Sequence, residues 1–537
     1  MTQSLHAALR FSATLCCLAL LMPTAHAEKL RGKVVDAQSG AALPCRLYVQ
    51  AEDGTWLFAK SAGKEGSAIR YSVERGVNSV EKHVTLSADP FEVDVPAGKS
   101  TIIVELGKEY QPLTKTVVVG AEPVEIELPL ARWIDMPARG WYSGDTHVHR
   151  KLEEMPNLML AEDLHVTLPL TYWVREAYEP ATHGKLAGDV KAELIQVAPN
   201  RVIWPINTEY ELFTLRGQPH TQGAVFVINQ RRGLELATPP VLPVARQAHA
   251  SGALLDLDKH SWNWSPMIVP IMNVDLFELA NNHVWRTEFA FKNWTLDVLP
   301  ENWEIETEPG GYTEWGWIDW GFKTYYAFLN CGFRMRPTGG TAGGVHPVPV
   351  GFGRVYVQVP GEFSYDKWIK GLDAGNSFVT TGPMLMVEFN GQSAGAVFKS
   401  ATEAAITGKA ESRSPLDRIE IVVNGDVVRT VKPANLPSKT GGFSSAIAET
   451  LPLKRSSWVV VRCFEQRPGK RFYFAHTAPA HYEIDGPVRP KRREVAYFIE
   501  RMTKEIDRNR KLLAAEELAE YEQALAIYRK LEKIATD

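Results

Sequence analysis

Cysteine is scarce in this chain of 537 residues, which contains only five. Two of them lie in the first 17 residues, and the other three, Cys45, Cys331 and Cys463, are far apart in the sequence. An odd number at such spacing excludes a disulfide framework, and at most one pair could close. We expect the fold to depend on hydrophobic cores instead, for which 15 tryptophans and 21 phenylalanines supply the material.

Long hydrophobic runs are also missing beyond the N-terminal segment. No later stretch reaches the roughly 18 consecutive apolar residues that a membrane helix requires, so we expect no transmembrane anchor. Residues 1–27 are typical of an export signal, with Arg10 as its basic start, an apolar core over residues 11–22 and Ala25-His26-Ala27 as the cleavage pattern. Because Thr14-Leu15 is a poor lipidation signal, we expect cleavage after Ala27 and a secreted or periplasmic protein.

Positive charge is not in excess. The 59 basic and 63 acidic side chains give a net charge of −4, and the loss of residues 1–27 would make it −5. No basic stripe dominates any segment, which argues against a nucleic acid as the partner. A glycine-rich phosphate loop, a nucleophile elbow and a catalytic cysteine setting are missing too, and Cys331 is typical of a small buried residue.

Several domains are expected, because roughly 510 residues exceed what one hydrophobic core can organise. Residues 28–134 follow a β pattern, with strands expected over residues 29–36 and 45–49 and a hairpin formed by residues 91–95 and 101–104. This segment resembles the transthyretin-like, carboxypeptidase-regulatory β-sandwich. Such a module would support or present a ligand rather than catalyse a reaction.

Residues 135–385 differ in character. Short apolar runs alternate there with helical patterns, at residues 203–206, 224–228, 253–255 and 274–277. This alternation predicts a parallel, barrel-like α/β domain, in which functional residues gather at the carboxyl ends of the strands.

The last third of the chain predicts a second sandwich and a helix. Over residues 386–487, Asn390-Gly391 and Asn424-Gly425 are typical hairpin turns, because both residue types tolerate positive φ. Residues 488–537 are expected to be helical, with an apolar stripe of ordinary core or interface spacing at Val495, Phe498, Ile499, Met502 and Ile506.

Two histidines stand one residue apart in Gly144-Asp145-Thr146-His147-Val148-His149, after what we expect to be the end of a strand over residues 133–141. In an extended segment, residues i and i+2 point to the same side, so both imidazoles can aim at one point, as a first-row metal ion requires. The alternative is a pair of solvent-facing histidines. Nine of the fourteen histidines fall between residues 147 and 346, which favours the metal site.

Further candidate ligands follow the predicted strands. Glu209 follows residues 203–206, His260 follows residues 253–255, and the segment from Glu278 to His283 follows residues 274–277. Glu211 would share a face with Glu209 and could replace it. Asp145 could bind a metal or orient His147 from behind. Lys259 could polarise a substrate oxygen or form an ion pair with Asp256 or Asp258.

The order of four motifs resembles that of the PHP (polymerase and histidinol phosphatase) superfamily. They are Gly144–His149, Asn207-Thr208-Glu209-Tyr210-Glu211, Asp256-Leu257-Asp258-Lys259-His260 and the late pair Asn281-Asn282-His283 and Gly339-Gly340-Thr341-Ala342-Gly343-Gly344-Val345-His346. Within the superfamily the chain is similar to secreted metallohydrolases of the CehA/McbA type, to which residues 376–383 and 474–479 are also similar. The resemblance covers residue 140 to about residue 500.

This resemblance implies a distorted (β/α)7 barrel that holds two or three divalent metals for the hydrolysis of esters, carbamates or phosphoesters. It also implies that His147 and His149 are the opening ligand pair and that Glu209 is the carboxylate that bridges metals. His260 matches the mid-chain histidine, and His346 the last histidine.

The chain departs from the family pattern in two places. Thr171-Tyr172-Trp173 stands where the family has Thr-Asp-His, and the late motif lacks its aspartate. Either fewer metals bind, or Asp163, His165 and His283 substitute, although His165 could equally be a core histidine. One zinc needs about three protein ligands and an open position, so one competent metal remains possible. We expect one or two ions of Zn, Mn or Fe, with no ion beside Tyr172-Trp173.

The sequence therefore predicts a secreted metal-dependent hydrolase within a multidomain chain of α/β and all-β parts. The expected metal ligands are His147, His149, Glu209, His260, His283 and His346, all converging on one centre. Lys259, His260 or His283 would stabilise or protonate the leaving group. The alternative is a non-catalytic binding protein of the cell envelope on a decayed enzyme scaffold.

Aromatic residues crowd the segment before the last histidine motif. Such a cluster could line a pocket for a small molecule or a glycan-like substrate, or it could be core packing. The set comprises Trp303, Tyr312, Trp315, Trp317, Trp320, Phe322, Tyr325 and Tyr326.

Overall fold

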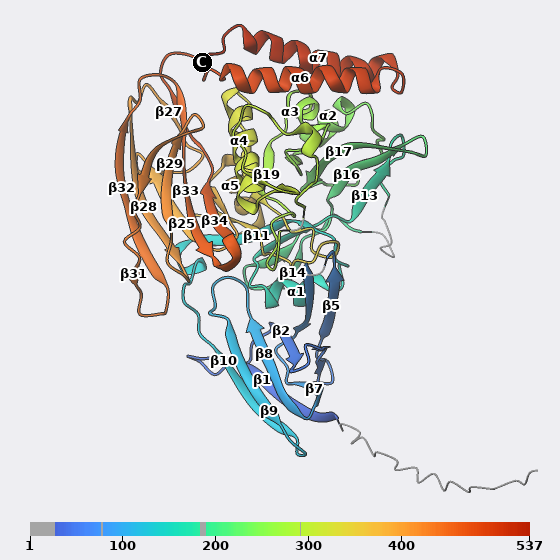
Figure 1. Ribbon diagram of the computed structural model, residues 1–537, viewed down its shortest axis with the longest axis vertical. Coiled ribbons are helices and arrows are strands. Elements are labelled where there is room, and N and C mark those ends of the chain that lie inside the picture. Colours follow the sequence, from blue (N-terminus) through green and yellow to red (C-terminus); the bar gives the residue numbers. More distant parts are fainter. Residues whose placement is uncertain (1–26, 77–78, 183–189, 290) are drawn as a thin grey trace, which may run out of the picture.

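The computed structural model describes residues 27–76, 79–182, 190–289 and 291–537. The predicted export signal lies outside these residues except for Ala27, where the first strand begins. The described chain is mostly β-structure in several domains, with only seven α-helices (Figure 1). The N-terminal sheets lie at one end of the molecule, the C-terminal sandwich lies along one side, and two long helices cross the opposite end (Figure 1).

The N-terminal part is built from two sheets around a shared apolar core. One sheet has the order β10 (Val124–Leu130), β1 (Ala27–Asp36), β7 (Phe91–Pro96) and β4 (Lys60–Ser61). The other has the order β5 (Ala68–Glu74), β6 (Val80–Leu86), β2 (Cys45–Ala51), β8 (Gly98–Glu105) and β9 (Leu113–Val119), with β3 (Trp56–Leu57) on β2. The core between them includes Leu47, Phe91 and Val104.

The predicted hairpin of residues 91–95 and 101–104 is wrong, although both strands exist. β7 pairs with β1 and β4, whereas β8 pairs with β2 and β9. Pro96 has no N–H to donate, and Gly98 adopts φ 122°, so the chain leaves one sheet here and enters the other. The turn therefore joins the two layers of the sandwich.

The middle part contributes strands to two sheets. A six-stranded sheet has the order β13 (Tyr172–Glu176), β16 (Thr208–Leu215), β17 (Gln218–Ile228), β18 (Leu254–Leu257), β19 (Leu276–Ala280) and β22 (Arg336–Gly339). A twelve-stranded sheet starts with β14 (Ile195–Ala198), β15 (Arg201–Ile203), β12 (Val166–Pro169), β11 (Trp141–Val148), β23 (Arg354–Gln358) and β24 (Ser377–Thr380).

A single closed seven-stranded barrel is not what the described residues show. The two sheets meet where Val148, at the end of β11, forms an isolated parallel bridge with Gly343, beyond β22. Strict β–α alternation also fails, because β16 and β17 form an antiparallel hairpin. Arg216 and Gly217 at its tip adopt φ 52° and 72°, the left-handed pair that a tight hairpin turn needs.

The twelve-stranded sheet continues without a break into the C-terminal sandwich. β24 pairs with β34 (Arg471–Thr477), which is followed in the sheet by β33 (Ser457–Arg467), β29 (Arg418–Val423) and β30 (Asp426–Val431), with β27 (Val397–Lys399) and β35 (Ala480–Glu483) beside them. The facing sheet has the order β26 (Gln392–Ser393), β25 (Met384–Phe389), β28 (Glu403–Ser412), β32 (Phe443–Pro452) and β31 (Leu436–Pro437).

Both Asn-Gly hairpin turns of this sandwich are confirmed. Asn390 and Gly391 (φ 48° and 74°) link β25 to β26, and Asn424 and Gly425 (φ 49° and 87°) link β29 to β30. A further small hairpin, in the middle part, pairs β20 (Thr307–Glu308) with β21 (Gly311–Tyr312).

Helices cover the middle part. Four of them are α1 (Met155–Ala161), α2 (Leu242–Ala250), α3 (Ser265–Met272) and α5 (Tyr365–Ala374), and short 3-10 turns span Pro137–Arg139, Leu296–Val298 and Pro468–Lys470. The longest helix here, α4 (Glu314–Asn330), starts where the Thr313 side chain accepts a hydrogen bond from the N–H of Gly316. Almost all of α4 is buried, so most of the aromatic cluster packs in the core.

The predicted C-terminal helix is two helices, α6 (Arg492–Asn509) and α7 (Ala515–Glu532), folded back on each other (Figure 1). The apolar stripe is buried as expected, except for the half-buried Ile499. The chain is extended at Ala514 (ψ 162°), and Glu517 accepts the N–H of Ala514 where α7 begins.

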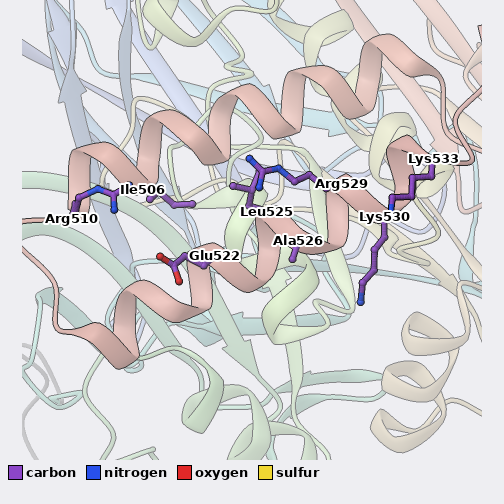
Figure 2. A pocket seen from close by; sticks show the side chains of 8 residues that line it. All are labelled: Ile506, Arg510, Glu522, Leu525, Ala526, Arg529, Lys530 and Lys533. Atoms are coloured by element: carbon purple, nitrogen blue, oxygen red, sulfur yellow. The ribbon is translucent and has the colours of Figure 1, made fainter.

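A groove of about 470 Å³ runs between these two helices. Its floor is apolar and its rim is charged, and the side chains that line it are shown in Figure 2: Ile506, Arg510, Glu522, Leu525, Ala526, Arg529, Lys530 and Lys533.

Cys45, Cys331 and Cys463 are all buried and free, so no disulfide links the described residues. Within the same residues, no helix combines the length and the apolar character needed to cross a membrane.

Candidate metal centre

The His-x-His motif lies at the junction of the two middle sheets. The expected strand over residues 133–141 is wrong: Pro137–Arg139 forms a 3-10 turn, and β11 starts at Trp141. His147 is therefore inside β11, and His149 follows its end. The loop after β22 is fixed to this end, because Ala342 N–H donates to the His147 carbonyl (2.8 Å) and His149 N–H donates to the Gly343 carbonyl (2.9 Å).

Three of the six side chains expected to converge, those of His147, His149 and Glu209, lie close together. The Nε2 atoms of His147 and His149 are 3.2 Å apart. Glu209 Oε2 lies 3.0 Å from His149 Nε2, and Glu209 Oε1 lies 3.9 Å from His147 Nε2. Two ligand atoms bonded at about 2.1 Å to one tetrahedral ion lie roughly 3.4 Å apart. The observed separations have the size of the edges of such a coordination sphere.

The contact between Glu209 and His149 is not a hydrogen bond despite its length. Glu209 Oε2 is buried and accepts no hydrogen bond within the described part of the chain. Acceptor atoms that face each other without a proton between them repel, unless a cation lies among them. This is how two ligands of one ion are arranged.

A second group extends the site on the other side of the His147 ring. His147 Nδ1 lies 2.9 Å from Glu278 Oε2 and 3.8 Å from Asp258 Oδ1. In a third group, carboxylate oxygens of Glu209, Glu211 and Asp258 lie within 4.8 Å of one another. These overlapping groups place five further acidic or histidine side chains around His147.

Asp258 was expected only as an ion-pair partner of Lys259, and Glu278 only as the start of a candidate segment from which His283 was chosen as the ligand. Both are fully buried, and Asp258 Oδ1 and Glu278 Oε1 have no hydrogen-bond partner within the described residues. A signal for them was present in the sequence. Each is an acid within or next to an apolar strand, and a buried carboxylate there is costly unless a cation or a donor compensates it.

Glu209 itself is placed differently from the prediction. Pro205 interrupts the apolar run of residues 203–206, so β15 ends at Ile203 and a new strand, β16, starts at Thr208. Glu209 is the second residue of β16 rather than a residue beyond a strand end. Glu211, two residues on, shares its face and joins the same acidic group.

Burial controls the charges of this cluster. It raises the pKa values of the Glu209 and Glu278 carboxyl groups well above their ordinary range, and Asp258 adds to both shifts. Burial and then Glu209 raise the pKa of Glu211 to about 8. Burial lowers the pKa of His149 to about 4, so its imidazole is neutral, as a metal ligand must be. The residues present therefore fit a divalent cation, which would stabilise the carboxylates in their charged form.

His260, His283 and His346 belong to none of the tight groups in the described residues. His260 packs against Trp317 and Trp320, with ring centroids 4.6 and 4.7 Å apart. The His283 ring lies 4.9 Å from Trp317 and 6.0 Å from His346. These three histidines form an aromatic-walled set beside the cluster, and their role as ligands stays a prediction.

Each histidine of this aromatic-walled set has a free ring nitrogen. Both ring nitrogens of His260 and the Nδ1 atoms of His283 and His346 are buried without a hydrogen-bond partner in the described residues. Burial is the main cause of their lowered pKa values, about 3 for His260, so all three rings are neutral. Neutral, unpartnered imidazoles can accept a hydrogen bond or bind a ligand.

Asp145 stabilises the backbone next to His147. It accepts hydrogen bonds from the Thr341 hydroxyl (2.7 Å), the Gly351 N–H (2.7 Å) and the His147 N–H (3.1 Å). Lys259 forms a buried ion pair with Asp258, which was the alternative to a role in polarising a substrate oxygen. Its Nζ lies 4.3 Å from the centre of the Trp262 ring.

The proposed substitutes Asp163 and His165 are engaged elsewhere. Asp163 forms ion pairs with Arg132 (3.0 Å) and Arg201, and His165 Nδ1 lies 3.1 Å from the Ser143 hydroxyl. His165 is therefore a satisfied core histidine. On the side where the family motif is missing, the Trp173 ring lies 4.9 Å from the His149 ring and forms the wall of the site.

No family model matches the chain, and no curated protein matches it. Among solved structures, it is similar to a two-domain protein from Bacteroides vulgatus described as containing a predicted PHP-like metal-dependent phosphoesterase. The identity is 10%, over 60% of this chain and 90% of the other, with a TM-score of 0.30. Because this TM-score does not establish a shared fold, function has to be argued from the side chains of the site.

Proposed function

We propose that this protein is a metal-dependent hydrolase of the PHP type that cleaves an ester, a carbamate or a phosphoester. The observation that supports it most is the convergence of His147 Nε2, His149 Nε2 and Glu209 within 3.0–3.9 Å, with Glu209 Oε2 buried and without a hydrogen-bond partner in the described residues. A divalent cation held there would polarise the scissile group and lower the pKa of a bound water towards ~7.

The surrounding side chains fix this centre. With a cation bound, Glu278 would accept a hydrogen bond from the Nδ1–H of His147, which would leave Nε2 as a lone-pair donor towards the ion. Asp145 holds the backbone of β11 to the loop after β22. Lys259 supplies a fixed positive charge beside Asp258, in position to stabilise negative charge that develops on a substrate oxygen.

The aromatic-walled set supplies hydrogen-bonding groups and a dry environment. Burial keeps His260 and His283 neutral and their ring nitrogens are unpartnered, so either can accept a hydrogen bond from the attacking water or from a hydroxyl of the substrate. Trp317 contacts both rings and excludes water between them. We propose that a small-molecule or glycan-like substrate binds against these aromatic rings.

We also propose that the two middle sheets assemble into a distorted (β/α)7 barrel of the CehA/McbA type. We propose further that the protein is exported, with cleavage after Ala27, into the periplasm or the medium. The order of the motifs supports the first and the pattern of residues 1–27 supports the second. The mass of the N-terminal peptide of protein recovered from the expressing cells tests the cleavage site.

The test of function combines metal content with hydrolysis. Purified protein loaded with Zn²⁺, Mn²⁺ or Fe²⁺ is assayed by elemental analysis and on p-nitrophenyl acetate, p-nitrophenyl phosphate and its diester. We expect bound metal and hydrolysis in the wild type, loss of both in H147A, and retention of both in H249A. His249 is a matched control because it lies on α2 and pairs with Asp275 (2.8 Å).

A protein that binds none of the three metals would overturn the proposal. Bound metal without hydrolysis of any substrate would favour the non-catalytic binding protein, for which the missing residues at Tyr172-Trp173 are the structural argument.

A further inference from the structure

A second charged site lies apart from the candidate metal centre. A cavity of about 220 Å³ opens where the N-terminal sandwich, the middle sheets and the C-terminal sandwich meet. Only two acids, Glu105 and Glu162, are among its lining residues. Six cationic side chains line it: Arg46, Lys108, Arg286, Arg354, Arg413 and Arg467.

Three of these cations are neutralised by carboxylates. Arg46 pairs with Glu105 and Glu162, Arg286 pairs with Glu81 (3.0 Å), and Arg467 pairs with Glu465 (3.1 Å).

Lys108, Arg354 and Arg413 form no ion pair with any acid in the described residues. Each contacts only neutral acceptors: Lys108 Nζ donates to the Thr381 carbonyl (2.7 Å), Arg413 to the Tyr110 carbonyl (3.2 Å), and Arg354 to the carbonyls of Gly351 (2.6 Å) and Glu162 (3.0 Å). The six cations face four carboxylates, Glu81, Glu105, Glu162 and Glu465, so positive charge is in excess at this cavity.

Burial makes this arrangement costly. Arg354 is only 1% exposed, and its Nη1 atom is buried without a hydrogen-bond partner, as is Nε of Arg46. Burial, followed by the charges of Arg354 and Arg413, holds the pKa of Lys108 well below its usual range. Buried charges are normally paired, so an anion in the cavity would remove this penalty.

We propose that this cavity binds a phosphate group, either free or carried by a small molecule. A tetrahedral oxyanion offers acceptors to several guanidinium forks at once, which is the geometry that arginine recognises best. The cavity volume admits a phosphate with a short organic substituent. The site draws Arg46 and Lys108 from the N-terminal sandwich, Arg354 from the middle part and Arg413 from the C-terminal sandwich, so the bound anion would connect all three.

The phosphate site also reaches the loop that positions the metal centre. Arg354 Nε donates to the Gly351 carbonyl, the Gly351 N–H donates to Asp145 (2.7 Å), and Asp145 accepts the His147 N–H. An anion held by Arg354 would therefore stabilise the backbone on which His147 stands. The inference does not depend on the proposed hydrolysis.

Calorimetric titration of the full chain in phosphate-free buffer tests the site. The two probes are inorganic phosphate and methylphosphonate, which carries an organic group and has no ester bond to cleave. Saturation by phosphate alone identifies a free anion as the ligand, and tighter binding of methylphosphonate identifies a substituted one.

Variants separate this site from the metal centre. We expect R413Q to bind the anion about tenfold more weakly, as loss of one charge-assisted contact predicts. We expect H147A and R429Q to bind like the wild type. Arg429 is a matched control, since it lies in the same sandwich and pairs with Glu449 (3.5 Å). No anion binding, or binding lost in H147A and kept in R413Q, would overturn the proposal.

A second variant covers the case in which R413Q fails to fold. K108M removes a buried positive charge and keeps the length of the side chain. Without phosphate we expect its midpoint of thermal unfolding to exceed that of the wild type, while phosphate raises the wild-type midpoint more than that of K108M. A lower midpoint in phosphate-free buffer, with an unchanged response to phosphate, would show that Lys108 needs no counter-ion.

Discussion

His147 Nδ1 lies 2.9 Å from Glu278 Oε2, and both side chains are buried. With a cation in the centre Glu278 would be a carboxylate that can only accept, so Nδ1 would carry the proton and Nε2 would present its lone pair towards the ion. A carboxylate behind a metal-binding histidine fixes the ring orientation and raises its basicity. Glu278, the first residue of the candidate segment that ends at His283, thus lies directly against the predicted His-x-His pair.

Replacing Glu278 by Gln tests this relationship. The amide no longer favours the correct tautomer of His147, so we expect metal affinity to fall by about 10–100-fold with little change in fold. Competition with a chromogenic chelator measures the affinity. E388Q, an exposed change on β25, is the matched control, and equal affinities of the two variants would contradict the role of Glu278.

Lys259 should act on the reaction and not on the metal. We expect K259M to lower kcat by about 100-fold, because a fixed charge that stabilises a developing oxyanion contributes on that scale. Metal binding should not weaken, because the change leaves Asp258 without its cation and adds negative charge to the cluster. Loss of metal together with activity in K259M would assign Lys259 a structural role instead.

The N-terminal sandwich should influence the site through Tyr71. Its hydroxyl donates to the His346 carbonyl and accepts the Gly344 N–H (3.0 Å), so it spans the loop that carries His346. We expect Y71F to lower stability by about 1 kcal/mol and to reduce hydrolysis as well. Y482F removes a comparable hydrogen bond to Asn390 (2.8 Å) far from the loop, and it should lower stability without a change in hydrolysis.

Stability should fall in acid because of His476. Burial lowers the pKa of His476 to about 3, and the Tyr326 hydroxyl (2.7 Å) and the Thr477 carbonyl (2.7 Å) hold the neutral ring. The unfolded chain, with a histidine pKa near 6.5, takes up the proton first. The contribution is complete above about pH 6.5 and is lost progressively as the pH falls towards 3.

Urea denaturation at pH 7 and pH 5 measures this effect. Between these values the free energy of unfolding of the wild type should fall by about 2 kcal/mol more than that of H476Q. Equal losses in both proteins would show that His476 is already charged in the folded state.

Local patterns in the sequence predicted local structure well, for physical reasons. The i, i+2 spacing of His147 and His149 is enough to bring their Nε2 atoms to 3.2 Å in an extended backbone. Asn390-Gly391 and Asn424-Gly425 form hairpin turns because the turn requires positive φ at both positions. These features depend only on neighbouring residues.

Longer-range features were not predictable in the same way. No local pattern shows that β24 pairs with β34 across about ninety residues, so the continuous twelve-stranded sheet could not be foreseen. Asp258 and Glu278 are ordinary acids in the sequence, and only the folded chain places them against His147. The periodicity of the apolar stripe also does not show that the backbone becomes extended at Ala514, which divides the C-terminal helix in two.

Crystals of the protein grown with Zn²⁺ or Mn²⁺ and measured at the metal absorption edge test the central claim most directly. An anomalous peak should lie about 2.0–2.2 Å from His147 Nε2 and His149 Nε2 and from a Glu209 oxygen, with no peak beside Tyr172-Trp173. A peak held by other residues, or no peak in metal-loaded crystals, would contradict the assignment of this cluster as the metal centre.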